Sequence, residues 1–359
     1  GISPQRQAIA LGWFPLFVNR IKDCREGMQR QTHMHRWCSL AASCVEALCH
    51  LVEKVDGTVE KLNSMHTLVW SEIFSLLQFV AGFDDAKDEA LTSYLNEIAI
   101  FASRTLHSAV DENVEMVENL DQNSNTWTQI EAFVKPSTNS VRGLPPLAQL
   151  HFTGFLVLCR QLGSSEVCQH LLEHFAIEML GPFLVMDDVN LLDETKTKYD
   201  QALRLWEKQK QEYKLEDDVI NAVDARKEPA RQIARRQKST PREGKAKFDE
   251  RSDGEQMVQD ALKQWELMFA PLHVSLEVAA NLFSCLVRHD SDMSSDLDES
   301  MDADLAQAVL RHGIVQKIQN LFFVTGDYQL THPTIDGKLK DDIVDVVSKL
   351  MACLSNIAL

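Results

Sequence analysis

Apolar residues recur three and four positions apart through most of the chain, and no segment shows the sustained alternation of a half-buried strand. This pattern predicts an all-α protein. Twelve segments follow the helical period: 4–22, 31–55, 63–82, 86–108, 126–134, 147–162, 165–183, 192–223, 254–269, 272–288, 303–323 and 340–358. The connecting segments richest in Pro, Gly, Ser or charge are 135–146, 226–253 and 326–337.

The segment Leu305–Phe323 is typical of two helices joined by a tight turn. We expect the first helix to end at His312–Gly313 and the second to begin at Ile314, because glycine adopts the left-handed backbone of such a turn. This pair resembles the first two helices of an armadillo repeat. A third helix, 340–358, ends in the armadillo-like series Ala352, Leu354 and Asn356.

An earlier copy of this ending contains Ala280, Asn281 and Leu282, and a weaker copy lies around Leu48. Asn281 and Asn356 are 75 residues apart, which exceeds a repeat length of about 40 to 47 residues and requires insertions between repeats. The sequence therefore predicts an armadillo/HEAT-like α-solenoid with long charged insertions. An irregular helical bundle remains an alternative, because amphipathic helices need only some partner to bury a face.

Three segments follow from this interpretation: N-terminal helical repeats over 1–190, a charged helix and basic insertion over 191–253, and armadillo-like repeats over 254–359. In the second segment, Tyr199, Ala202, Leu203 and Trp206 form one helical stripe. The stripe either docks the helix onto the solenoid or binds a partner, so Trp206 is a candidate partner-binding residue.

The charge is uneven. The 359 residues carry a net charge of −17, yet Arg226–Lys247 holds nine bases and two acids, which leaves −24 for the rest of the chain. An acidic surface repels phosphate backbones, so basic proteins are more plausible partners than duplex nucleic acid. The basic segment is a targeting signal, a solvated linker or a partner of the acidic stretch within the same chain.

The stretch Asp290–Asp304 contains seven acids and no base. Mutual repulsion predicts that it stays extended and hydrated until a cationic partner arrives, although such a run also occurs as a merely solubilising insertion. The candidate partner-binding acids are Asp290, Asp292, Asp296, Asp298, Glu299, Asp302 and Asp304.

One enzymatic motif needs weighing. His170, Glu173 and His174 match the H-x-x-E-H pattern of inverted zinc peptidases, in which two imidazoles bind zinc and the glutamate activates water. Two histidines at this spacing are commonly surface residues of an amphipathic helix, and no strand-rich peptidase domain accompanies them, so we treat the peptidase as a remote alternative. The chain contains no GxGxxG, P-loop or GxSxG motif, so we expect a non-enzymatic protein without a cofactor or metal.

Eight cysteines without a CxxC pair are typical of buried thiols in a reducing compartment. No uninterrupted apolar run approaches the roughly 20 residues that span a bilayer, so we expect no membrane partner.

The order of these features resembles the symportin family, which are HEAT/armadillo-repeat adaptors for large-subunit ribosomal proteins. The resemblance rests mainly on residues 254–359, where a helix like SLEVAANLFSCLV leads into an acidic run and VVSKLMACLSNIAL follows. It implies a cytoplasmic and nuclear chaperone that binds 5S-RNA-associated ribosomal proteins and travels with an importin. By position, Asp290–Asp304 would contact cargo, while Asn281 and Asn356 would line a concave face. A helical-repeat scaffold subunit of a larger complex remains the alternative function.

Overall fold

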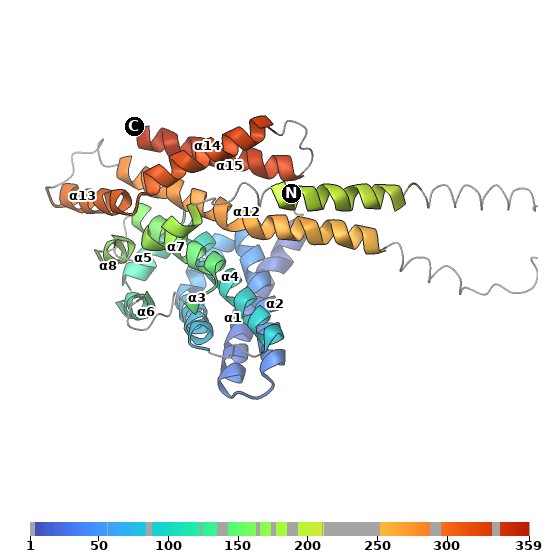
Figure 1. Ribbon diagram of the computed structural model, residues 1–359. Coiled ribbons are helices and arrows are strands. Elements are labelled where there is room, and N and C mark those ends of the chain that lie inside the picture. The colour runs from blue at the N-terminus through green and yellow to red at the C-terminus, as the bar shows by residue number, and fades with distance from the viewer. Residues whose placement is uncertain are drawn as a thin grey trace, which may run out of the picture. The chain divides into compact units, whose positions relative to one another are not determined.

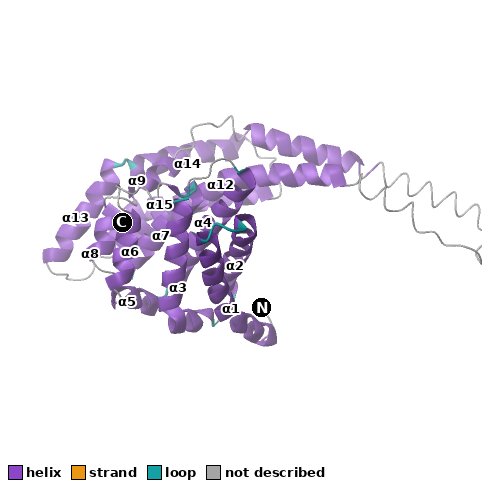
Figure 2. Ribbon diagram, turned by 90° about the horizontal axis from the view of Figure 1, so that it is seen from below, coloured by secondary structure: helices purple, strands orange, loops and turns teal. Residues whose placement is uncertain are grey.

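All regular secondary structure in the described part of the computed structural model is helical, which confirms the all-α class (Figures 1 and 2). The structure describes residues 4–55, 57–83, 88–122, 124–134, 143–162, 166–173, 177–184, 193–209, 211, 252–287, 296–331 and 338–358. The basic segment Arg226–Lys247 lies outside the described residues.

The first half of the chain contains α1 Pro4–Gln29, α2 Met34–Lys54, α3 Thr58–Ala81, α4 Glu89–Val110, α5 Val114–Gln122, α6 Ser124–Val134, α7 Pro146–Gln161, α8 Glu166–Leu171, α9 Ile177–Leu180 and the 3-10 helix η3 Gly181–Leu184. A further helix covers residues 193–209. The second half contains α12 Ser252–Val287, α13 Asp296–Arg311, α14 Ile314–Thr331 and α15 Lys338–Ala358.

Local side chains explain two helix starts. Asp88 caps α4, because its Oδ1 accepts a hydrogen bond from the Leu91 backbone N–H at 3.1 Å. Asn113 performs the same role for α5, with its Oδ1 accepting from the Met116 backbone N–H at 3.2 Å. The sequence analysis missed α5, whose nine residues offer too few turns for a clear apolar period.

An aromatic cluster holds α3 against α7. Trp70 and Phe74 of α3 contact Phe155 of α7, with ring centroids 5.9 and 6.1 Å apart. Phe152 extends the cluster to Phe133 of α6 at 5.5 Å. Rings at these separations pack edge to face or tilted, and each buries a large apolar area.

Helices α2 and α4 run parallel, since side-chain contacts join both their beginnings and their ends. His35 Nε2 lies 2.7 Å from Asp88 Oδ2 at the beginnings, and Arg104 Nη2 donates to Glu53 Oε2 at 2.9 Å near the ends. Helix α4 also packs extensively on α7. Helix α7 also meets α12, where Gln161 Nε2 donates to the Asn281 carbonyl at 2.7 Å.

The second half of α12 also contacts α15. Asn356 Nδ2 donates to the Ala280 carbonyl at 3.2 Å and to Ser284 Oγ at 3.0 Å. Earlier in both helices, His273 Nδ1 lies 2.9 Å from Asp345 Oδ2. These contacts make α12 and α15 parallel neighbours, so α2, α4, α7, α12 and α15 are joined in that order.

The helix pair predicted around Gly313 is confirmed. Helix α13 ends at Arg311 and α14 begins at Ile314, with Gly313 in the left-handed region at φ 64°. Helix α14 continues to Thr331 instead of ending at Phe323. The predicted connector 326–337 is therefore wrong in its first part, because a single glycine costs a helix only about 1 kcal/mol.

Pro271 does not divide α12, although two helices, 254–269 and 272–288, were expected there. Proline removes one backbone hydrogen bond, and the burial of Phe269, Leu272 and Leu276 around it offsets that loss. Among the described residues, this continuity produces one helix, Gln256–Leu286, that is long and apolar enough to cross a membrane. Half of its most apolar window is buried within the protein.

The structure describes the helix predicted over 165–183 only in part. Helix α8 ends at Leu171, and α9 begins at Ile177. All eight cysteines are buried, which confirms the predicted burial of the thiols.

Contacts divide the chain into two compact units that differ from the three predicted segments. The first unit combines residues 1–185, 271–330 and 343–359, because α12 and α15 continue the helix row that begins with α2. The second unit contains residues 186–270 and 331–342.

Candidate partner-binding surface

The acidic stretch is helical where the structure describes it. Asp296, Asp298, Glu299, Asp302 and Asp304 lie in the first half of α13, whereas Asp290 and Asp292 lie outside the described residues. The expectation of an extended chain is wrong for 296–304. A helix macrodipole favours carboxylates near its N-terminus, and this gain opposes part of their mutual repulsion.

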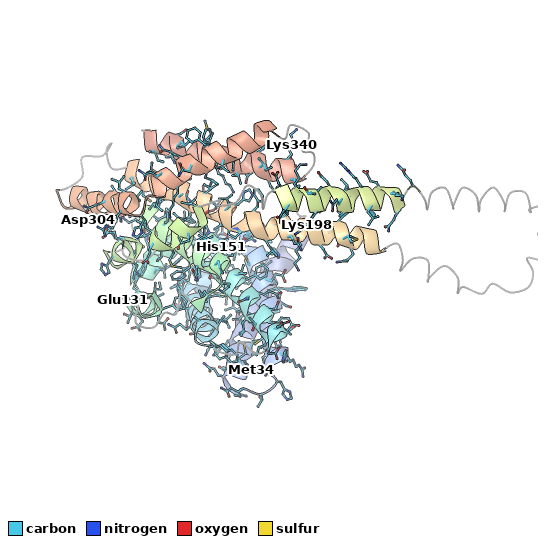
Figure 3. The ribbon with its side chains drawn as sticks, viewed as in Figure 1. Met34, Glu131, His151, Lys198, Asp304 and Lys340 are labelled. Carbon is cyan, nitrogen blue, oxygen red and sulfur yellow. The ribbon has the colours of Figure 1, made fainter. Side chains whose placement is uncertain are left out.

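The second half of α13 anchors the helix. Leu305, Ala308 and Val309 are buried, while Asp304 is exposed at the junction of the two halves (Figure 3). Because the second half of α13 is held in place, each further residue towards Asp296 extends an existing helix by one backbone hydrogen bond. The five acids therefore belong to a preformed helix attached to the first unit.

The two predicted asparagines lie at neighbouring joints of the helix row. The Asn281 carbonyl accepts from Gln161 of α7, and the Asn356 amide donates to Ala280 and Ser284 of α12. The structure thus brings both residues to the α7, α12 and α15 seam. Their armadillo-like positions hold neighbouring helices together, and a role in partner contact remains a proposal.

Trp206 lies in the second unit, on the helix 193–209. Figures 1 and 2 show this helix beside the first half of α12. The predicted stripe faces inward at Ala202, which is buried, and Trp206 is half-buried. On α12, Trp265 is fully buried, stacks on Phe269 at 4.4 Å and donates from Nε1 to Asp342 Oδ2 at 3.1 Å. The apolar stripe is therefore already partly buried within the second unit.

The H-x-x-E-H residues are only partly described. His170 is exposed on α8, and Glu173 Oε1 accepts from Gln169 Nε2 at 2.8 Å just after that helix ends. His174 lies outside the described residues. Within the described ranges, no group of three or more His, Cys, Asp and Glu side chains could hold a metal ion.

A pair of histidines that the sequence analysis missed lies at the α4–α7 joint. His107 and His151 are each 7% exposed, and their Nδ1 atoms are 3.5 Å apart. Burial lowers the pKa of His107 to about 4 and that of His151 to about 3, so both are neutral at pH 7. Each interrupts an apolar helix stripe, which was a signal of burial, but only the fold pairs residues 44 positions apart.

The neighbouring α2–α4 joint is charged. Glu53 accepts from both Nε and Nη2 of Arg104, and Ser108 Oγ donates to Glu53 Oε1 at 3.4 Å. The Arg104 side chain is 40% exposed and that of Glu53 is 15% exposed, so water still reaches the pair.

Comparison of the chain with family models, curated proteins and solved structures finds no match.

Proposed function

We propose that this chain is a non-enzymatic adaptor that binds a basic protein through the acidic first half of α13. The observation that carries the proposal is five carboxylates and no base within nine residues, on a helix anchored by the buried Leu305, Ala308 and Val309. A preformed helix loses less conformational entropy on binding than an extended loop does, which favours affinity.

We further propose that the first unit is an armadillo/HEAT-like α-solenoid with charged insertions. The ordered joints from α2 through α4, α7 and α12 to α15 support this architecture, because repeat helices contact their neighbours in sequence order. The helix, glycine and helix arrangement at Gly313 and the seam positions of Asn281 and Asn356 agree with it.

The cargo class follows from charge. With a net charge of −17, the chain attracts basic proteins over a distance of about one Debye length, roughly 8 Å at physiological salt. The symportin resemblance specifies large-subunit ribosomal proteins that associate with 5S RNA, an importin as a further partner, and a path from cytoplasm to nucleus. Masking a basic RNA-binding surface is the chemical task proposed for α13.

The test is affinity capture from cell extract at low and high salt, with wild type and a charge-neutral α13. The neutral variant carries D296N, D298N, E299Q, D302N and D304N. Basic ribosomal proteins should bind wild type at low salt, elute as salt rises, and be lost from the variant. Retention by the variant would remove α13 from the mechanism.

A matched control neutralises five exposed acids elsewhere in the first unit. The control variant carries E60Q, E89Q, E97Q, E112Q and E118Q. It changes the net charge by the same amount, so a role specific to α13 requires this control to retain cargo. Equal losses in both variants would show that overall charge is responsible.

A scaffold subunit of a larger assembly is the second candidate, favoured by an apolar face on α1. Trp13 is 54% exposed and Leu16 is 64% exposed, while Phe14 and Val18 on the same helix are buried. Exposed aromatic residues are enriched at protein interfaces. A salt-insensitive complex in native mass spectrometry that W13E disrupts would favour this function over the adaptor.

A further inference from the structure

Two imidazole rings point directly at each other in the α4–α7 joint. The Nδ1 atoms of His107 and His151 are 3.5 Å apart, and the ring centroids are 5.8 Å apart. The difference, 2.3 Å, matches the combined centroid-to-nitrogen lengths of two imidazoles. Both nitrogens therefore lie on the line that joins the rings, with their in-plane ligand directions opposed.

The surroundings hold this arrangement. A Cβ on Gly154 would lie 2.7 Å from Cε1 and Nε2 of His107 and 3.0 Å from Val278 of α12. The His107 ring consequently rests on the α7 backbone with no space for a side chain between them. Each histidine is only 7% exposed, so bulk water has little access to the gap between the nitrogens.

The nitrogens are available as ligands. Burial lowers the pKa of both rings well below 7, to about 4 and about 3, so neither carries a second proton under ordinary conditions. Their 3.5 Å separation exceeds the roughly 2.9 to 3.0 Å typical of a protein N–H···O hydrogen bond. The hydrogen between the rings makes only a weak bond, which a cation could replace.

The number of ligands selects the kind of cation. Protein zinc sites are almost always four-coordinate, and the described residues offer no third His, Cys, Asp or Glu ligand to such a group. Two opposed imidazoles suit a cation that accepts two ligands in a line, and Cu(I) combines that geometry with affinity for imidazole. Metal–nitrogen bonds of about 2 Å require nitrogens about 4 Å apart, so each ring need retreat only about a quarter of an ångström.

We propose that His107 and His151 form a two-coordinate Cu(I) site that joins α4 to α7. On binding, the hydrogen carried by one Nδ1 moves to Nε2 of the same ring, and both Nδ1 lone pairs bind the cation, so no proton is released overall. Asp111 and Glu53 act electrostatically on His107 in the direction that favours positive charge, while Arg104 opposes them. The two carboxylates thereby offset part of the cost of burying the cation.

The test is anaerobic competition for Cu(I) between the protein and a chromophoric Cu(I) chelator. Cysteine thiolates are also ligands for Cu(I), and the chain contains eight free cysteines, so the readout is a difference between variants. Wild type should bind one more equivalent than H107N/H151N, whereas H66N, the same substitution at a histidine outside the joint, should keep that equivalent. Equal stoichiometry in wild type and a folded H107N/H151N would overturn the proposal.

X-ray absorption of wild type loaded with one Cu(I) equivalent keeps the proposal falsifiable even if the double variant does not fold. Two nitrogen ligands in a linear arrangement are expected, and a spectrum with sulfur ligands alone would overturn it. A parallel titration with Zn²⁺ should show no site that depends on His107 and His151. A zinc site of equal stoichiometry that disappears in a folded H151Q would refute two-coordination.

Discussion

Helix α13 and the α4–α7 joint both gather ionisable side chains, yet they treat charge in opposite ways. The first half of α13 carries five acids, of which Asp304 is exposed. The joint buries His107 and His151 and keeps them neutral. Charge is retained where water or a partner solvates it and removed where neither does. Changes to α13 should therefore alter recognition, and changes to the joint should alter stability.

The largest expected effect is a loss of stability in acid. The folded pKa values of His107 and His151, about 4 and about 3, lie below the ordinary value of 6.5. Below pH 6.5 these two histidines bind protons in the unfolded chain but stay neutral in the folded joint. The free energy of unfolding is highest above pH 6.5 and falls towards pH 4, by up to about 3 kcal/mol per pH unit for two protons.

Urea midpoints at pH 7, 6 and 5 measure this slope. A folded H107N/H151N variant lacks both titrating groups, so its stability should decline less steeply over the same range. Identical slopes for the variant and wild type would contradict the assignment to the joint, because all other carboxylates and histidines are common to both.

A middle-sized effect is expected from Gly154→Ala. The new methyl group would overlap the His107 ring at 2.7 Å, and overpacking of a core costs about 1 to 3 kcal/mol. Gly12→Ala is the matched control, since a Cβ there meets nothing within 4 Å. The control should gain up to about 1 kcal/mol of helix stability. If thermal or urea unfolding showed that both variants are more stable than wild type, the α4–α7 joint would have room for the added methyl group.

The smallest effect is expected at the α2–α4 joint, which lies between the two extremes. Glu53→Gln should lower the free energy of unfolding by about 1 kcal/mol, because Arg104, at 40% exposure, regains water when its partner is neutralised. The loss should shrink in 1 M salt, which screens partly exposed pairs. A salt-independent loss of several kcal/mol would instead indicate a fully desolvated pair.

Much of the fold could be predicted from local patterns. The apolar period predicted most helices, and Gly313 predicted the turn between α13 and α14, because both are properties of a few consecutive residues. Pro271 misled the prediction, since its local cost is offset by burial that the sequence does not reveal. The acids of α13 misled the prediction for the same reason, because the burial of Leu305, Ala308 and Val309 holds the acidic stretch in a helix.

The site was harder to predict. The sequence shows directly that the fifteen residues Asp290–Asp304 contain seven acids. The contacts of Asn281 and Asn356, by contrast, depend on which helices meet. The His107 and His151 pair joins residues 44 positions apart, and no local pattern shows that their nitrogens oppose one another. Long-range pairing of this kind is a property of the packed helices.

The adaptor function is tested most directly by the salt dependence of binding to a purified 5S-associated ribosomal protein. For wild type, the dissociation constant should rise steeply between 50 and 500 mM salt, and the slope of its logarithm against log salt should fall when the five acids of α13 are neutralised but not in the matched control. Equal slopes and equal affinities for wild type and the α13 variant would contradict recognition of a basic cargo by this helix.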